Sequence, residues 1–279
     1  MAREHNGVYV LDYDGLVARH GRERWHDAKK WLTVRLPMAA GHLNDMAREW
    51  LRFLHPLSGR IAKALVVDLD NTLWGGVVGE DGMEGIQLSA EHPGAYFQAV
   101  QRVLLDLYRR GILLAIASKN NPADAMEALE RHPGMVLRPE HFAAMRIGWE
   151  SKAKAMGEIA AELNIGVDSL AFFDDNPVER QHVREEAPEV TVIEAPAEAS
   201  GYARALRDCP FFERLALSGE DRRRNEFYAV RRESAALEKS AATPEDFYRS
   251  LAQKWKYAKW TERRWRGWRS LRRRRISST

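Results

Sequence analysis

The sequence predicts an α/β fold: a doubly wound, mostly parallel sheet without a large cap, followed by a helical C-terminal extension. Three short aliphatic runs, residues 65–67, 111–118 and 170–173, have the composition of buried strands, and helical segments separate them along the chain. Such alternation is typical of a parallel sheet. Each run also ends directly on polar residues. Because charges cannot stay inside a sheet, these residues must lie at its carboxyl edge, where open α/β folds bind ligands.

The first strand ends on the carboxylate pair Asp68 and Asp70, followed by Asn71 and Thr72. A carboxylate such as Asp68 can attack phosphorus, and Asp70 can protonate the leaving oxygen and later activate water. Both steps gather negative charge, so a hard cation with oxygen ligands, most plausibly Mg²⁺, is expected. An Asp-x-Asp pair alone is a weak signal, and the remaining groups must therefore come from later strands.

The second strand ends on Ser118, whose hydroxyl can donate to a phosphoryl oxygen. An amphipathic helix over residues 94–110 precedes this strand, a helix opened by Pro122 follows it, and residues 142–147 form a short extended segment. None of the intervals between motifs can hold a separate lid domain. Glycines 75, 76, 79, 82 and 85 predict a short flap over an open active-site mouth, or a tight hairpin.

Two further segments complete the predicted site. The helix opened by residues 149–152 carries Lys152, which can neutralise a bound phosphate and the aspartates. The third strand ends on Asp174 and Asp175. In the helix that follows, we expect Asn176 as the N-cap, Pro177 as the first residue and Glu179 as the capping-box partner.

These motifs together resemble those of the haloacid dehalogenase (HAD) superfamily. The longer strings DLDNTLWGGVVGEDG, IASKNNPADA, WESKAKAM and FFDDNPVER resemble the FkbH-like proteins of polyketide biosynthesis more narrowly. The resemblance implies an enzyme that takes a phosphorylated three-carbon acyl donor, 1,3-bisphosphoglycerate, releases phosphate and loads a glyceryl unit on an acyl carrier protein.

Carried over residue by residue, the resemblance implies Asp68 as nucleophile and Asp70 as acid and base. It places phosphate contacts on Ser118, Lys152, Asn71 and Thr72, and Mg²⁺ ligands on Asp68, Asp174, the adjacent Asp175 and the carbonyl of Asp70. A stand-alone Mg²⁺-dependent phosphatase of small phosphate esters would use the same residues without a carrier protein. A third hypothesis, a non-catalytic basic binder, depends on the C-terminal tail alone.

The chain divides by composition into four expected regions. Residues 1–60 resemble the end of an SGNH-hydrolase-like module, with an apolar helical pattern from Leu43 to Leu54. Within them, residues 8–11 read as a strand ending on a second Asp-x-Asp pair, Asp12 and Asp14, which we interpret as loop or edge residues. Residues 61–208 form the catalytic domain, and residues 209–253 form a connector with helices over 218–239 and 244–251.

The last region, residues 254–279, is basic and rich in tryptophan. Residues 254–275 contain eleven Lys or Arg residues and one acidic residue, so the remainder of this +3 chain is acidic. We favour a frameshift or truncation as the origin of this composition. Read in a shifted frame, GC-rich DNA yields the codons CGG, AGG, TGG and GGG, which encode Arg, Trp and Gly. The alternative is an evolved tail that binds nucleic acid or a membrane. If residues 254–279 are not a native part of the protein, no nucleic-acid partner is expected.

Composition fits a cytoplasmic α/β enzyme without membrane contact. No apolar run approaches the ~20 residues of a bilayer span, and no signal-peptide core is present near the first residue. The single cysteine, Cys209, excludes an internal disulfide and a cysteine zinc cluster. Its neighbours include no base or cation that would lower a thiol pKa, so we expect a buried or linker cysteine outside the catalytic set.

Overall fold

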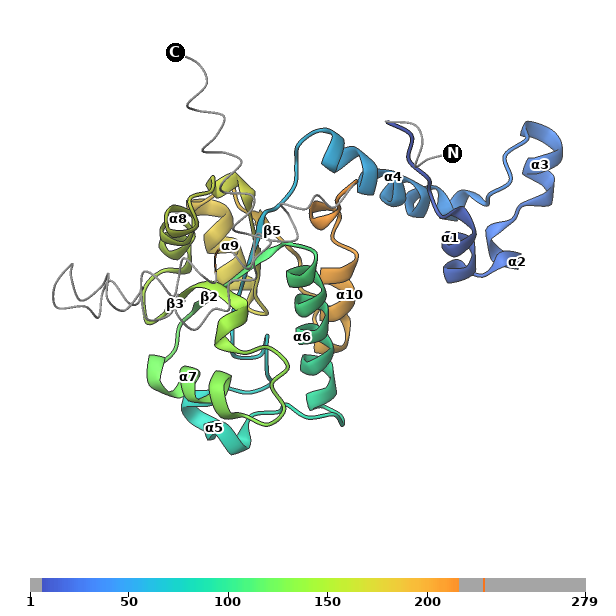
Figure 1. Cartoon of the computed structure of the whole chain (residues 1–279). Helices are drawn as coiled ribbons and strands as arrows, with labels where there is room; N and C mark the ends of the chain where they lie inside the picture. Colours follow the sequence, from blue (N-terminus) through green and yellow to red (C-terminus); the bar gives the residue numbers. More distant parts are fainter. Residues whose placement is uncertain (1–6, 216–227, 229–279) are drawn as a thin grey trace, which may run out of the picture. The chain divides into compact units, whose positions relative to one another are not determined.

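A computed structural model of the chain describes residues 7–215 and residue 228. Five parallel strands form one sheet in the order β3-β2-β1-β4-β5 (Figure 1). The strands are β1 (Ala64–Val67), β2 (Leu113–Ser118), β3 (Phe142–Ile147), β4 (Leu170–Phe173) and β5 (Thr191–Val192). The parallel α/β sheet and its three main strands are confirmed. The two-residue strand β5 was not predicted, because its run is too short to show a pattern.

Helices connect the strands as a doubly wound fold requires. These are α5 (Val78–Gly85), α6 (Gly94–Arg109), α7 (Pro122–Arg131), α8 (Lys152–Leu163), α9 (Pro177–Glu186) and α10 (Tyr202–Arg207). Short 3₁₀ turns lie at η2 (Pro139–His141), η3 (Val167–Ser169), η4 (Ala199–Gly201) and η5 (Pro210–Phe212). Helix α6 packs against α10, and α8 packs against α9, on opposite sides of the sheet (Figure 1).

The main core lies between the sheet and these helices. Strands β1, β2 and β4 are buried along their whole length. The predicted helix over residues 94–110 is confirmed as α6, which buries Val100, Leu104 and Leu107 at helical spacing against β2. Gln101 is also fully buried, and its amide donates to the carbonyl of Leu73 and accepts from two backbone N–H groups of the β2–β3 connection.

The N-terminal residues form a smaller helical cluster. It contains α1 (Tyr13–His20), α2 (Arg22–Trp25), α3 (Ala28–Val34), η1 (Ala40–His42) and α4 (Leu43–Leu57). Its core consists of five buried apolar residues, Leu16, Val17, Trp25, Met38 and Met46. The predicted helix from Leu43 is confirmed. The predicted strand over residues 8–11 is wrong, since these residues form no strand pairing. Asp12 caps α1 by accepting a hydrogen bond from the backbone of Gly15, 2.9 Å away, and Asp14 lies in the first turn of α1, not in a loop or at a sheet edge.

The glycine-rich segment after β1 also differs from the predicted flap or hairpin. Residues 78–85 form helix α5, kinked at Gly82, and two backbone hydrogen bonds between Gly75 and Gln87 close the loop. Gly76 and Gly82 adopt positive φ, which favours glycine over other residues there.

The remaining regional predictions concern the C-terminal segment and the boundaries between regions. The helices expected at 218–239 and 244–251 and the basic tail lie outside the described residues, and the four regional boundaries stay predictions. In the part of the chain that is described, no helix combines the length and apolar character needed to cross a bilayer.

Candidate active site

Strand register brings the predicted carboxylates together. Val67 pairs with Phe173, so Asp68 and Asp174 follow side by side at the carboxyl edge of β1 and β4. The backbone N–H of Asp68 donates to the carbonyl of Phe173 at 3.2 Å and continues the ladder into the site. The strand order reverses between β1 and β4, and this switch point is where open α/β sheets bind ligands.

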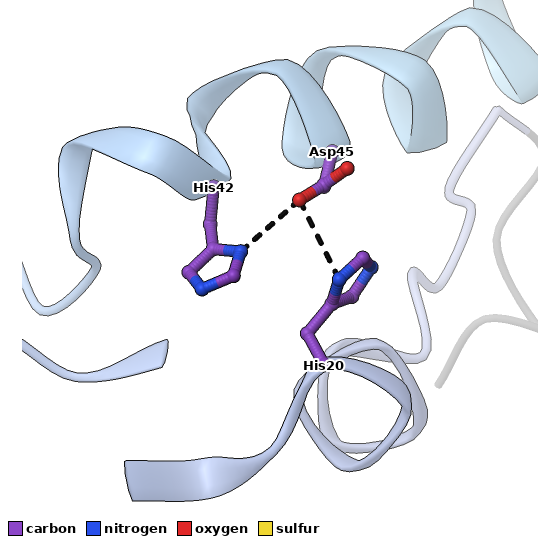
Figure 2. Close-up of side chains that lie close together, drawn as sticks. All are labelled: His20, His42 and Asp45. Atoms are coloured by element: carbon purple, nitrogen blue, oxygen red, sulfur yellow. Dashed lines mark hydrogen bonds and ion pairs between the residues drawn. The ribbon is translucent and has the colours of Figure 1, made fainter. Parts of the chain in front are cut away.

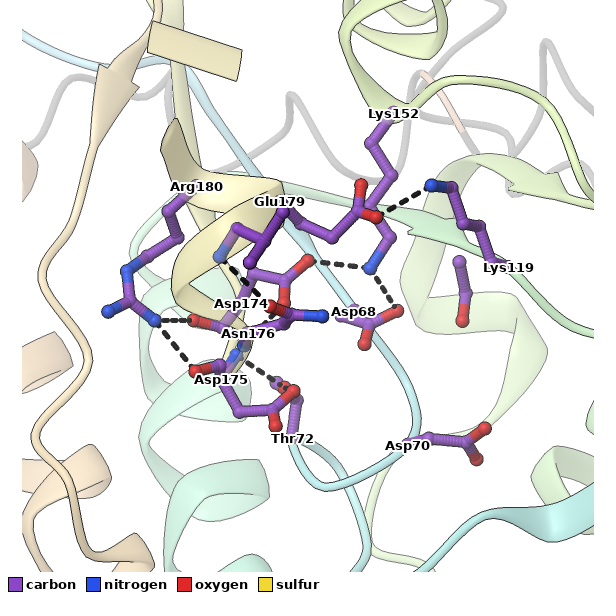
Figure 3. Close-up of polar contacts among 12 residues, drawn as sticks. Asp68, Asp70, Thr72, Lys119, Lys152, Asp174, Asp175, Asn176, Glu179 and Arg180 are labelled. Carbon is purple, nitrogen blue, oxygen red and sulfur yellow. Dashed lines mark hydrogen bonds and ion pairs between the residues drawn. The ribbon is translucent and has the colours of Figure 1, made fainter. Parts of the chain in front are cut away.

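Lys152 links the two carboxylates (Figure 3). Its Nζ lies 2.9 Å from Oδ1 of Asp68 and donates to Oδ2 of Asp174 at 2.6 Å. All three side chains are buried, and Asp174 has no exposed surface. Helix α8 begins at Lys152, so the first turn of this helix delivers the cation to the sheet edge.

Burial and charge compete in setting the ionisation of this group. Burial raises the pKa of Asp68 to about 6; the Lys152 ammonium opposes this shift and the charge of Asp174 reinforces it. Burial likewise raises the pKa of Asp174, against the effect of Lys152. For Lys152, burial favours a lower pKa, but the charges of Asp68 and Asp174 outweigh it and raise the pKa. With a pKa of about 6, Asp68 is largely ionised at neutral pH.

The segment after β4 is fixed by its own hydrogen bonds. Thr72 Oγ1 accepts from the backbone N–H of Asp175 at 3.3 Å and donates to its Oδ1 at 3.4 Å. Arg180 donates at 2.8 Å to the carbonyls of both Asp174 and Asp175. Asn176 caps α9, as predicted, by accepting from the backbone of Val178. These contacts hold the Asp175 carboxylate toward Asp68 and Asp174.

Glu179 is not the capping-box partner of Asn176. The backbone N–H of Asn176 donates to Oδ1 of Asp174 at 2.8 Å, so the group that Glu179 would have satisfied is already bonded. The Glu179 carboxylate instead accepts from Lys119 at 2.6 Å. This pair joins the loop after β2 to α9, a link between distant segments that local sequence patterns cannot reveal.

Asp70 lies apart from the cluster and is held by three donors. Its Oδ1 accepts from the indole of Trp74 at 2.8 Å and from the backbone of Val78 at 3.1 Å, and its Oδ2 accepts from Asn120 at 2.9 Å. Figure 3 shows its side chain pointing away from Asp174 and Lys152. Trp74 and Asn120 were not singled out from the sequence, although Asn120 stands only two residues after Ser118.

The predicted phosphate-binding residues divide into two groups. Ser118 and Lys152 line a common cavity of about 310 Å³ at the ends of β2 and β3. Ser118 Oγ accepts from Asn120 at 3.2 Å, and its hydroxyl also bonds to the Asp68 carboxyl, an interaction that lowers the pKa of Asp68. Thr72 is fully buried and engaged with Asp175, whereas Asn71, in positive φ, accepts from the backbone of Gly76 at 2.9 Å. Phosphate contacts by all four stay predictions.

The cluster has the features of a divalent-cation site. Asp68, Asp174 and Asp175 each offer one carboxylate oxygen, and these oxygens lie within 4.8 Å of one another. Oδ1 of Asp68 is buried, and the Lys152 ammonium lies 2.9 Å from it. With Lys152, the three carboxylates leave two negative charges uncompensated. Hard oxygen donors with this charge suit a small divalent ion. The carbonyl of Asp70 as a further ligand stays a prediction.

Cys209 lies outside this constellation and is buried. Burial raises the pKa of its thiol to about 11, so little thiolate forms at neutral pH. The expectation of a buried cysteine is confirmed.

Comparisons with known proteins point to one family. The model of the Acid Phosphatase family matches residues 60–205, the segment that carries every residue of the site. Among solved structures, the chain is similar to the N-terminal part of a Bacteroides fragilis protein, which contains a phosphatase domain and is complexed with Mg, at 36% identity and a TM-score of 0.72. That match covers 77% of this chain and 57% of the other. No curated protein matches the chain.

Proposed function

The chain belongs to the Acid Phosphatase family, within the HAD-type phosphatases, and on that premise we propose that it is a Mg²⁺-dependent phosphoryl hydrolase acting through an aspartyl-phosphate. The observation that carries the proposal is the convergence of Asp68, Asp174, Asp175 and Lys152 at the switch point of the sheet. A buried group of three carboxylates around a single ammonium is unusual, because removing these charges from water is costly.

The acidic cluster fits Mg²⁺, which the solved relative contains. Asp68, Asp174 and Asp175 would hold the ion, and it would supply positive charge that lets a carboxylate approach a phosphoryl group. Lys152 and Ser118 would hold phosphoryl oxygens, since both line the cavity beside the cluster.

The chain's own residues divide the reaction into two steps. An oxygen of Asp68 attacks phosphorus while the bond from phosphorus to the leaving oxygen breaks, and Asp70 gives that oxygen a proton. Water then attacks the aspartyl-phosphate, its proton passes to Asp70, and the bond between phosphorus and Asp68 breaks. Asp70 accepts three hydrogen bonds in the structure, so it must exchange one of these partners to reach the leaving oxygen.

The finer proposal concerns the substrate and partner. We infer that the donor is 1,3-bisphosphoglycerate and that a glyceryl unit passes to an acyl carrier protein. The support is the extended similarity of the four motif strings to FkbH-like proteins and the intervals between the described strands, which hold helices and turns but no separate lid domain. Cys209 favours the stand-alone phosphatase instead. It is the single thiol of the sequence, it is buried, and its pKa is about 11, so it is poorly suited to carry a glyceryl group.

One incubation separates these candidates. The protein is mixed with 1,3-bisphosphoglycerate, Mg²⁺ and a phosphopantetheinylated carrier protein, and both free phosphate and the intact mass of the carrier are measured. Phosphate release with a glyceryl-sized gain in carrier mass supports transfer, and release without it supports the stand-alone phosphatase. Absence of phosphate release above the spontaneous rate would overturn both.

A matched pair of variants ties the activity to the site. Asp68→Asn removes the nucleophile and is expected to abolish release. Asp12→Asn alters the other Asp-x-Asp pair and should leave release unchanged, because Asn caps α1 as well as Asp does.

A further inference from the structure

A second cluster of ligand-type side chains lies in the N-terminal helices, away from the phosphatase residues. His20 is the last residue of α1, His42 ends η1 and Asp45 stands in the first turn of α4. Figure 2 shows both imidazole rings directed at one oxygen of Asp45. Nδ1 of His42 is 3.1 Å from Oδ2 of Asp45, and Nδ1 of His20 is 3.5 Å from the same oxygen.

These separations match the edges of a tetrahedral metal site. Ligands about 2.05 Å from a central zinc ion lie roughly 3.3 Å apart, between the two distances observed. One atom of each residue lies within 4.8 Å of the others. We propose that His20, His42 and Asp45 bind a divalent transition-metal ion of the Zn²⁺ class.

The chemistry of the donors separates this site from the first one. Two imidazole nitrogens and one carboxylate favour Zn²⁺ and its neighbours, whereas the all-carboxylate cluster favours Mg²⁺. Each ring would coordinate through the Nδ1 lone pair, and a proton held on that nitrogen would pass to solvent when the metal binds.

Trp25 fixes both rings before any ion arrives. Its indole stacks on His42, with ring centroids 4.7 Å apart and planes 19° apart, and lies 5.5 Å from the ring of His20. Trp25 is fully buried, and its Nε1 donates to the hydroxyl of Tyr13 at 2.8 Å. Ligands held in place by packing lose little entropy on binding a metal.

The cluster is also accessible. The three side chains are each about one fifth to one quarter exposed, and His20 and Asp45 line a cavity of about 840 Å³ together with Arg48 and Glu49. A three-ligand ion here would keep an open position for water, as zinc sites with three protein ligands do. In the alternative explanation of this cluster, the two histidines only hydrogen-bond to Asp45 and no metal ion binds.

The test is calorimetric titration of Zn²⁺ into the EDTA-treated full chain, with millimolar Mg²⁺ present to fill the carboxylate site. One Zn²⁺ per chain is expected. Asp45→Asn, which keeps the shape of the side chain, and His20→Ala should each weaken binding by about 100-fold or more. The control His182→Ala, which alters a histidine paired with Glu186 on α9, should bind like the parent.

A second readout keeps the proposal falsifiable if a variant folds poorly. Co²⁺ in the parent should show the intense visible absorption of a tetrahedral site, and Asp45→Asn should lose it while its circular dichroism stays unchanged. The Asp68→Asn variant should keep both the Zn²⁺ stoichiometry and the Co²⁺ spectrum. Absence of Zn²⁺ binding in the presence of Mg²⁺, or equal binding by Asp45→Asn and the parent, would overturn the proposal.

Discussion

Replacing Lys152 by Met tests the electrostatic account of the active site. The ammonium lies 2.9 Å from Asp68 and 2.6 Å from Asp174, and at an effective dielectric constant of about 20 each contact is worth roughly 6 kcal/mol of gross attraction. Desolvation offsets much of this. Removing one partner of a buried ion pair nevertheless costs about 3–5 kcal/mol, because the other charge is left buried and unpaired. We expect Lys152→Met to lose stability in this range.

The assay is urea unfolding of the parent and variant in EDTA at several pH values. The loss should be largest above pH 6, where Asp68 is ionised, and should shrink as the pH falls below the raised pKa of Asp68, because protonation removes its unpaired charge. Mg²⁺ should restore part of the stability of the variant, since the ion binds the folded state alone.

Lys154→Met provides the matched control. Lys154 lies on the same helix, exposed and paired with Glu150, so its replacement should change stability little. A Lys152→Met variant as stable as the parent at pH 7 in EDTA, or one whose stability loss does not depend on pH, would refute the reasoning.

Three further outcomes follow from the structure. Asp70→Asn should lower the rate of phosphate release by about 10²–10⁴-fold. Its Mg²⁺ affinity should stay nearly unchanged, since Asp70 offers the ion at most its backbone carbonyl. A loss of Mg²⁺ binding measured by calorimetry would argue against this role of Asp70. Mg²⁺ affinity should fall as the pH drops below about 6, because Asp68 must lose its proton to bind the ion; a titration series independent of pH between 5 and 8 would contradict the raised pKa. Gln101→Leu should destabilise the protein by about 3 kcal/mol in thermal or urea unfolding, because it strands the partly buried N–H group of Val136, the buried N–H group of Leu137 and the carbonyl of Leu73. A change under about 1 kcal/mol would show that these groups find other partners.

The sheet and the positions of the main carboxylates could be predicted because their signals are local. An aliphatic run followed by Asp specifies both a buried strand and the edge where it ends, and parallel strands bring these edges together. The expectation that Asp68 and Asp174 lie close enough to share a cation agrees with the register of β1 and β4.

Other features depend on contacts between distant segments and could not be predicted. Asp70 is bonded to Asn120, and Glu179 is bonded to Lys119 across the site, and no local pattern encodes those pairs. The false strand at residues 8–11 has a different cause. There, the apolar run pairs with no strand among the described residues, and Asp12 caps the helix that follows it.

Anomalous diffraction from crystals grown with Mn²⁺, a carboxylate-binding substitute for Mg²⁺, tests the central claim most directly. The account predicts one strong peak within coordination distance of the carboxylates of Asp68 and Asp174, with Asp175 beside it. A peak confined to other residues, or none there at saturating Mn²⁺, would contradict it.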